Sequence, residues 1–368
     1  MELPMNLNGN QQERARDNFR PELLGLRRRM LGLNQTELAK AAGISQGTLS
    51  KIEQGLKDIS SSNMETLARA LKCPASFFFQ PEREYGPPLS MHDGMYRKGA
   101  VGIKAIDKII AELNTRIAHA RTLLKSSDLE PELPLPFYEP EEYQGDFEKI
   151  AQNVRRAWLM PRGPVKNLTD FMERAGVLII KCDMSGARID GVSYQISGLP
   201  PIVFLNDEIP ADRERFTLAH ELGHLVMHKY PTESMEKEAN SFAAAFLMPA
   251  ADIAPDLKGI TLEKAAALKP YWKVSIGSLL YKAKTLRSVD EGQMQYLWRK
   301  RSALGWNTKE PESLDFENEK PTLLNALLQN MQDDLGYSLE ELSTALHLHL
   351  DEISQMYGLK QRPILRSV

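Results

Sequence analysis

His-Glu-Leu-Gly-His occupies residues 220–224, directly after Ala-Asp-Arg-Glu-Arg-Phe-Thr-Leu-Ala at 211–219. Residues four apart in an α-helix lie on one face, about 6 Å apart along the axis. His220 and His224 could therefore hold one Zn²⁺, while Glu221 reaches a metal-bound water as general base. Such a pentapeptide also occurs by chance in long chains. The same segment continues with apolar residues on one side, which predicts a helix and favours the metal site: Leu222, Leu225 and Val226.

A zinc hydrolase needs a third protein ligand and an open fourth position. The helical stretch 234–248 offers Glu236 and Asn240, an i, i+4 pair in which one residue can ligate while the other orients a ligand imidazole. Glu238 points away from Glu236 and is predicted to be solvated, although it stays the alternative ligand. An ordinary charged helix face would explain both glutamates. The position of Glu236 shortly after the two histidines favours a ligand.

The other histidines are not predicted to bind the metal. His228 lies eight residues after His220, about 12 Å along a continuous helix, which is too far for a shared ion. We expect it at the helix end or as a hydrogen-bond partner of a ligand. The remaining histidines lack ligand-like spacing: His92, His119, His347 and His349.

The wider motif resembles the ImmA/IrrE family of zinc metallopeptidases. The similar segments are Phe-Thr-Leu-Ala-His-Glu-Leu-Gly-His at 216–224, Glu-Lys-Glu-Ala-Asn-Ser-Phe-Ala-Ala at 236–244 and Leu-Met-Pro at 247–249. The resemblance covers about residues 145–290 and shows no departure that marks a dead site. It implies a zinc cofactor held by His220, His224 and Glu236, and it implies that Glu221 is the catalytic base.

A second pattern lies near the start of the chain. Apolar residues at 23, 24, 26 and 31 predict a first helix, and residues 35–53 then follow helix-turn-helix spacing. Ala39 is small where two helices cross, Gly43 forms the turn, and Ser45 is a good N-cap. Ile44, Leu49 and Ile52 are expected to anchor the second helix. Residues 19–80 resemble the XRE or lambda-repressor-like DNA-binding family.

In such domains the second helix of the motif enters the major groove of double-stranded DNA. The candidates for reading base edges are Ser45, Gln46, Thr48 and Ser50, and the candidates for phosphate contact are Gln35 and Lys51. Residues 20–73 contain nine Lys or Arg against five Asp or Glu, a net charge of +4. A solvated basic face or a protein-binding module would have the same composition. The register of the motif favours DNA.

Composition indicates an ordinary globular protein. The 368 residues carry a net charge of −3, with 42% hydrophobic and 26% charged residues, so two or three domains are expected. Two cysteines form neither a disulfide framework nor a metal clip. The start of the chain does not read as a signal peptide, and no apolar run is long enough for a bilayer. We expect a cytoplasmic protein without membrane contact.

The segment between the two motifs is predicted to be a linker. Apolar residues recur at helical spacing over 103–125, and this stripe must bury against the peptidase domain or a second copy of itself. A homodimer is expected because helix-turn-helix readers usually bind two half-sites. Residues 128–148 carry eight acidic and no basic residues with four prolines, which predicts an extended, self-repelling segment.

The predicted fold class is multidomain. An all-α helix-turn-helix domain spans 19–80, the linker 81–145, an α+β zincin-like metallopeptidase domain 146–290, and an all-α C-terminal region 291–368. Three short strands are expected in the peptidase domain, near 177–182, 191–195 and 201–205. Residues 338–342 and 349–353 have a helix-turn-helix cadence. Their acidic surface predicts a packing or partner module and not a DNA contact.

Together the two resemblances imply a DNA-binding transcriptional regulator with a zinc-dependent endopeptidase domain. It would act in a stress, mobile-element or toxin–antitoxin switch by cleaving itself or a partner repressor. Its partners would be operator DNA and a protein substrate, repressor or toxin. In one alternative, a repressor or antitoxin uses the zinc domain to sense a ligand or partner without proteolysis. In another, the helical head of a peptidase recognises protein.

Overall fold

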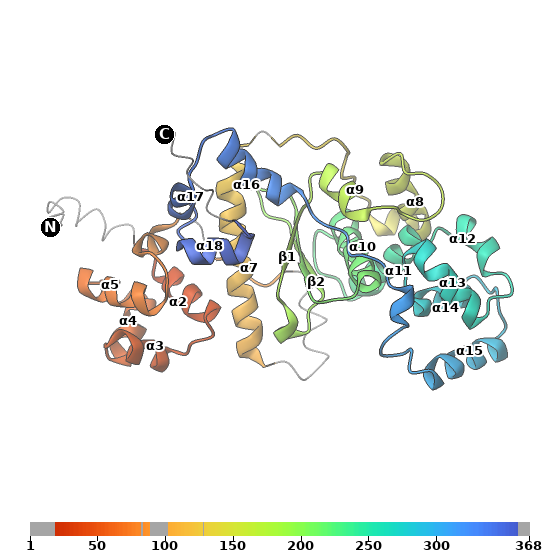
Figure 1. Ribbon diagram of the computed structural model, residues 1–368, viewed down its shortest axis with the longest axis horizontal. Helices are drawn as coiled ribbons and strands as arrows, with labels where there is room; N and C mark the ends of the chain where they lie inside the picture. The colour runs from red at the N-terminus through yellow and green to blue at the C-terminus, as the bar shows by residue number, and fades with distance from the viewer. Residues whose placement is uncertain (1–18, 82–83, 89–101, 128, 360–368) are drawn as a thin grey trace, which may run out of the picture. The chain divides into compact units, whose positions relative to one another are not determined.

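The computed structural model describes residues 19–81, 84–88, 102–127 and 129–359 (Figure 1). The chain forms two compact units. The first takes its residues from Met1–Pro87, Val101–Asp128 and Asn325–Val368, and the second from Pro88–Ala100 and Leu129–Leu324. The predictions made for His92 and for the start of the chain fall outside the described residues.

The first unit begins with a helical domain. Its elements are α2 (Pro21–Met30), α3 (Gln35–Ala42), α4 (Gln46–Glu53), α5 (Ser61–Ala70) and a 3₁₀ turn, η1 (Ala75–Phe79). Asn34 starts α3 with a capping box, Gly43 takes a φ of 69° at the turn, and the Ser45 side chain caps α4. These are the boundaries that the spacing predicted. Leu24, Leu38 and Leu49 are fully buried between the helices.

The first unit also contains a long helix and three helices from the end of the chain, as drawn in Figure 1. They are α7 (Ile103–Leu124), α16 (Leu323–Asp333), α17 (Leu339–Ala345) and α18 (Leu350–Tyr357). α7 packs against α2, and Ala111 of α7 belongs to the core of the helix-turn-helix domain. A 2.6 Å hydrogen bond joins Nδ1 of His119 on α7 to the hydroxyl of Tyr357 on α18.

α7 therefore packs against the helix-turn-helix domain of its own chain. The expected partners were the peptidase domain and a second copy of the helix, and neither expectation named this domain. The expected C-terminal region also differs from the structure. Residues 291–324 belong to the second unit, whereas the chain from Asn325 onward belongs to the first. The physical reason includes contacts of α18 with both helices: Glu352 pairs with Arg27 of α2, and Tyr357 contacts His119 of α7.

The second unit combines a small sheet with helices. Its elements in chain order are η2 (Pro140–Tyr143), α8 (Phe147–Ala157), α9 (Leu168–Arg174), β1 (Leu178–Cys182), β2 (Gly191–Tyr194), β3 (Ile202–Asn206), α10 (Ala211–Met227), α11 (Met235–Leu247), α12 (Ala250–Leu257), α13 (Leu262–Trp272), α14 (Ile276–Thr285) and α15 (Glu291–Ala303). The strand order is β1-β3-β2, with β1 parallel and β2 antiparallel to β3. The N-terminal domain is all-α, the middle part combines helices with a small sheet, and the C-terminal part is all-α. This confirms the predicted fold class.

The sheet supports the helix that carries the zinc motif. Every residue of β3 is buried, and α10 packs on β2 and β3. α11 packs in turn against α10 and α8, with Phe242 and Phe246 fully buried among the apolar residues of this core. None of the helices in the described part of the chain has the length and apolar character that a membrane crossing requires.

Residues 129–145 were predicted to be an extended linker, and this prediction is wrong. Leu133, Leu135 and Tyr138 pack against the core of the second unit. The backbone N–H of Tyr138 donates to the carbonyl of Val226 at 2.8 Å, and the Trp158 indole donates to the carbonyl of Pro134 at 2.7 Å. Apolar residues occur among the acidic ones in this segment, and they pack on the core while the carboxylates stay exposed.

Candidate metal centre and DNA-binding face

Three side chains from two helices converge in the second unit. His220 and His224 lie on the last two turns of α10, and Glu236 lies in the first turn of α11. The two Nε2 atoms are 2.9 Å apart. The Glu236 carboxylate oxygens lie 3.3 Å from Nε2 of His224 and 3.5 Å from Nε2 of His220. Ligands bound at about 2.1 Å to one tetrahedral ion are separated by about 3.4 Å, so this spacing suits one Zn²⁺.

The chemistry of these donors also fits a metal ion. Among the described residues, His220, His224 and Glu236 form a group whose ligand atoms all lie within 4.8 Å of one another. Glu236 Oε1 is buried and makes no hydrogen bond. A buried carboxylate oxygen without a donor is costly, and a cation would satisfy it. Two imidazoles and one carboxylate are the ligands that Zn²⁺ takes in hydrolases.

Each histidine of the group has a hydrogen-bond partner at its other ring nitrogen. Nδ1 of His220 lies 3.2 Å from Oδ1 of Asn240. Nδ1 of His224 lies 3.0 Å from Nδ1 of His228. If both Nε2 atoms face a metal, both Nδ1 atoms carry a proton, so His220 donates to Asn240 and His224 donates to His228. Such partners fix the tautomer and orientation of metal-binding imidazoles.

His228 and Glu238 extend this chain of hydrogen bonds away from the donor group. α10 ends at Met227, and His228 has extended backbone (φ −119°, ψ 110°), so its ring folds back beside His224. Nε2 of His228 donates to Oε2 of Glu238 at 3.0 Å. Glu238 was expected to be solvated, but its side chain is only 18% exposed and is held by this contact. Glu236 is the glutamate beside both imidazoles.

The protonation of the group follows from its contacts. Burial raises the pKa of Glu236, but the nearby imidazoles of His220 and His224 outweigh it and lower that pKa to about 2. Burial also opposes charge on His220, but the hydrogen bond to Glu236 and the charge of Glu221 raise the pKa of that imidazole. Burial lowers the pKa of His228 despite its contact with Glu238. Glu236 is therefore anionic, as a metal ligand must be.

The candidate base is buried and already oriented. Glu221 is 1% exposed, and its Oε2 accepts a 2.7 Å hydrogen bond from Oγ of Ser193 on β2. Sequence reasoning did not identify Ser193. The only signal was its place in a predicted strand, because the contact depends on the packing of α10 against β2.

A glycine allows the two helices of the site to approach each other. A Cβ atom on Gly223 would lie 3.1 Å from Cδ1 of Phe242 and 3.2 Å from Cα of Ala239. Both distances are shorter than ordinary van der Waals contact. The glycine inside the zinc motif thus permits the close packing of α10 and α11 that brings Glu236 to the histidines.

The candidate DNA contacts lie in and beside α4. Ser45, Gln46 and Lys51 are exposed, whereas Gln35, Thr48 and Ser50 are partly exposed. The Gln46 amide donates to Oε1 of Gln35 at 2.9 Å, and the Gln35 amide donates to Oε2 of Glu53 at 2.6 Å.

Glu53 also accepts two hydrogen bonds from the Arg28 guanidinium, at 2.7 and 3.1 Å. This network holds the Gln46 side chain before any ligand arrives. Sequence analysis did not identify Arg28 or Glu53 as its supports.

Comparisons with known proteins agree with both patterns. Residues 24–78 match the family described as helix-turn-helix, and residues 172–284 match the family described as the IrrE N-terminal-like domain. The chain therefore contains an XRE-type helix-turn-helix domain and an IrrE/ImmA-like domain, which confirms the two resemblances.

The relatives match a short part of the chain. An uncharacterized HTH-type transcriptional regulator of Sinorhizobium medicae is 36% identical over 55 residues, which is 15% of this chain and 40% of that protein. A similar regulator of Rhizobium meliloti gives the same values. An uncharacterized transcriptional regulator in the ATPase CF(0) region of Rhodospirillum rubrum is 39% identical over 70 residues, 19% of this chain and 62% of that protein. The chain thus spans less than two thirds of each relative. No solved structure matches it significantly.

Proposed function

We propose that this protein is a cytoplasmic transcriptional regulator whose helix-turn-helix domain binds operator DNA and whose second unit is a zinc endopeptidase. The observation that carries the proposal is the group of His220, His224 and Glu236 beside the buried carboxylate of Glu221. Cleavage of the protein itself or of a partner repressor would then end repression, in a stress, mobile-element or toxin–antitoxin switch.

In this proposal His220, His224 and Glu236 hold the metal. A bound Zn²⁺ supplies Lewis acidity for the scissile carbonyl and lowers the pKa of a water molecule. Glu221 would be the group that takes up a proton at this site and passes it to the leaving amine. Ser193 holds Oε2 of Glu221, which leaves Oε1 to carry the proton. Asn240 and His228 keep the two imidazoles in the required tautomer.

A polypeptide substrate suits the sheet of this unit. In the order β1-β3-β2, the strand β2 pairs with β3 on one side only among the described residues, and it lies against α10. An extended peptide can add to such an edge through main-chain hydrogen bonds. Ser193 links this strand to the candidate base, so a peptide paired with β2 would pass beside Glu221.

The first unit is the proposed DNA reader. α4 would enter the major groove, where Ser45, Gln46, Thr48 and Ser50 face base edges. The amide of Gln46 can pair with adenine, and Gln35 and Lys51 would contact phosphates. Proteins similar to a short part of this chain are named as transcriptional regulators, which supports the role. We also propose a homodimer on an operator with two half-sites.

One observation favours a second candidate function. The Ser193 hydroxyl donates a hydrogen bond to one oxygen of Glu221, the group that would serve as the base. A site in which this carboxylate is engaged could bind zinc through the histidines and Glu236 and sense a ligand or partner without proteolysis. The regulator would then change its DNA binding while the chain stays intact.

The two functions are separated by the substitution Glu221→Gln. It keeps the size of the side chain and both imidazoles, so zinc should remain bound, while the loss of a positioned general base costs about 10²–10⁴-fold in rate. His220→Ala should lose both metal and activity. Glu233→Gln, an exposed glutamate between α10 and α11, is the control.

In inducing cells, the wild type and the control should derepress a reporter and yield a repressor fragment on an immunoblot, and Glu221→Gln should do neither. Derepression by Glu221→Gln without any fragment would instead establish the sensor.

A further inference from the structure

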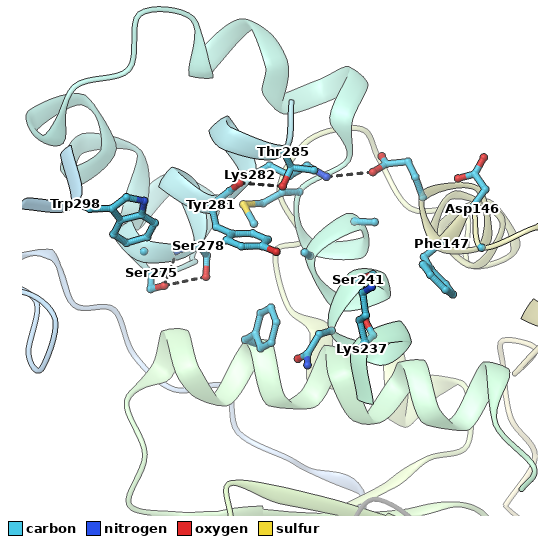
Figure 2. Close-up of a pocket in the computed structure, with 18 residues that line it drawn as sticks. Asp146, Phe147, Lys237, Ser241, Ser275, Ser278, Tyr281, Lys282, Thr285 and Trp298 are labelled. Carbon is cyan, nitrogen blue, oxygen red and sulfur yellow. Dashed lines mark hydrogen bonds and ion pairs between the residues drawn. The ribbon is translucent and has the colours of Figure 1, made fainter. Parts of the chain in front are cut away.

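A cavity of about 890 Å³ lies beside the donor group within the second unit (Figure 2). Two of its lining residues connect it to the site. Phe216 lies one helical turn before His220 on α10, and Asn240 both lines the cavity and contacts Nδ1 of His220. Asn240 is exposed, and Tyr281 at the opposite wall is 63% exposed, so the cavity reaches solvent next to the proposed metal.

The cavity walls are mainly aromatic and apolar. Figure 2 shows Tyr281 from α14 near the middle, with Phe147 of α8 on one side and Trp298 of α15 on the other. Met248 and Ala244 contribute further apolar surface.

Most charged groups in the lining are already engaged. Lys282 pairs with Glu148 at 3.1 Å, and Asp146 caps α8 through the Lys149 N–H at 3.0 Å. Lys237 is exposed at the surface of α11. The lining serines and Thr285 are also hydrogen-bonded to other groups of the protein. Although half of the lining residues are polar or charged, most of them are already paired, and the aromatic side chains leave a cavity suited to a bulky apolar group.

We propose that this cavity is the specificity subsite of the peptidase and receives an aromatic or large aliphatic side chain of the polypeptide substrate, next to the scissile bond. The inference rests on the proposed endopeptidase function. A peptide side chain is favoured over a free small molecule because the cavity begins one turn from the residues that would act on the peptide bond.

The test uses a peptide library of mixed sequence as the probe, with cleavage products read by mass spectrometry. Wild type should prefer Phe, Trp, Leu or Met at one position beside the cut. Ala244→Phe fills the cavity without removing a hydrogen bond, and Tyr281→Ala removes a wall. Each should lower kcat/KM for bulky peptides by about 10–200-fold, the range for a misfit in an apolar pocket, with zinc content unchanged. Tyr271→Ala, a tyrosine on α13 with 61% exposure, is the control.

The outcomes distinguish the subsite from the proposed function. Cleavage without a side-chain preference, or a preference that survives Ala244→Phe, overturns the subsite and leaves the peptidase standing. An absence of any cleavage by zinc-loaded wild type overturns both. Release of DNA on binding a small apolar probe such as a naphthalene sulfonate, without peptide selectivity, would assign the cavity to a sensor.

A second inference comes from the first unit, where the C-terminal helices repeat the geometry of the helix-turn-helix domain. Corresponding residues differ in number by 304, as Gly32 (φ 67°) and Gly336 (φ 73°) illustrate. The buried positions 23, 24 and 27 of α2 correspond to 327, 328 and 331 of α16. α4 at 46–53 corresponds to α18 at 350–357.

The turns of the two copies match in detail. A capping box starts α3 at Asn34 and α17 at Ser338. Nine residues after its cap, each copy has a residue with positive φ, 69° at Gly43 and 53° at His347. The next N–H of each copy bonds five residues back at 3.0 Å, from residue 44 to 39 and from 348 to 343. Agreement in caps, turn and buried positions identifies a second helix-turn-helix.

The second copy has lost the surface that would read DNA. Glu352 stands where α4 has Thr48, and its carboxylate accepts two hydrogen bonds from Arg27 of α2, at 2.6 and 2.8 Å. The Arg27 side chain is 2% exposed, so the pair lies inside the unit. Tyr357 at the other end of α18 contacts His119 of α7.

We infer that residues 323–359 are a second helix-turn-helix whose would-be recognition helix binds protein instead of DNA. Its partners are α2 and α7 of the same chain. This second helix-turn-helix thereby stabilises the DNA-binding domain through α18. The helix that corresponds to α18 in the first copy is α4, the proposed recognition helix.

The repeat provides matched substitutions for a test on the full-length protein. Lys51→Ala should weaken DNA binding and reduce the salt slope by about one, whereas Gln355→Ala, at the equivalent position of α18, should leave both unchanged. Leu350→Ala should likewise leave DNA affinity unchanged, unlike its equivalent Gln46→Ala. Loss of affinity in either α18 variant would show that the second copy reads DNA.

This stabilisation is tested by hydrogen exchange. Glu352→Gln leaves the buried Arg27 charge without its partner and should speed amide exchange in α2 and α18 at least 10-fold. Asp351→Asn, its exposed neighbour, should change neither helix. Equal exchange rates in the two variants would overturn the docking role of α18.

Discussion

Replacement of one glutamate at the start of α11 by glutamine should separate a metal ligand from a residue that supports one. Glu236→Gln and Glu238→Gln are the same chemical change two positions apart. Glu236 lies 3.3 and 3.5 Å from the two Nε2 atoms of the histidine pair. Glu238 reaches the site only through His228, across two hydrogen bonds of 3.0 Å each.

The expected magnitudes follow from these positions. Residues that orient a metal ligand from outside the ligand set contribute about 10–100-fold to affinity, so Glu238→Gln should fall at or below that range. Glu236→Gln removes an anionic ligand and should exceed 100-fold. At a zinc concentration 100 times the wild-type Kd, bound metal stabilises the folded unit by about 2.7 kcal/mol. For a unit of this size, about 2–4 °C per kcal/mol gives a zinc-dependent rise in Tm of about 5–11 °C.

Two measurements check the ranking. Competition with a chromophoric chelator measures the zinc Kd of each variant, and thermal unfolding with and without zinc measures the stabilisation. Wild type and Glu238→Gln should keep a zinc-dependent rise in Tm, and Glu236→Gln should lose it. The opposite ranking would make Glu238 the ligand. Absence of zinc binding in wild type would refute the metal site itself.

Three further predictions concern packing, pH and base readout. Gly223→Ala places a methyl group 3.1 Å from the Phe242 ring. The overpacking cost of about 1–3 kcal/mol should exceed the helix-propensity gain of about 1 kcal/mol, so urea denaturation should show a less stable second unit. Unchanged stability would contradict the tight packing of α10 and α11. Burial, reinforced by the charge of Arg116, lowers the pKa of His119 from 6.5 to about 3. Between pH 6.5 and pH 3 the imidazole of the unfolded chain therefore binds a proton that the folded chain does not bind. As the pH is lowered through this range, the free energy of unfolding of the first unit should decrease, with a slope approaching about 1.4 kcal/mol per pH unit. A flat profile in unfolding followed by circular dichroism would be inconsistent with a buried neutral imidazole. Gln46→Ala should cost about 1–3 kcal/mol and relax specificity at one base position in a binding assay on operator variants, whereas a uniform loss across sequences would indicate a phosphate contact.

Local geometry explains which expectations were confirmed. The spacing of His220 and His224 needs only an α-helix, and that helix runs over Ala211–Met227. The caps Asn34 and Ser45 act within three residues of their own positions. The three strands likewise appear where apolar and β-branched residues cluster. Interactions of this range are encoded by neighbouring residues, so a sequence pattern predicts them.

Contacts between distant residues explain the expectations that failed. Residues 129–145 were predicted from their charge to stay extended, but Leu133, Leu135, Tyr138 and Tyr143 pack on a core built by other segments. Glu238 was predicted to be solvated because its direction was judged against a straight helix. The end of α10 at Met227 turns His228 back and provides the partner.

The chain by itself determined the helix that bears the zinc motif, the turn and caps of the DNA-binding motif, and the donor types available for a metal. These depend on dihedral preferences and on hydrogen bonds within one or two turns. Only the tertiary structure decided that Ser193 holds Glu221, that Glu352 holds Arg27, and that α7 is covered within its own chain. The physical reason is that each of these contacts joins elements far apart in sequence, whose meeting depends on how all the apolar faces bury together.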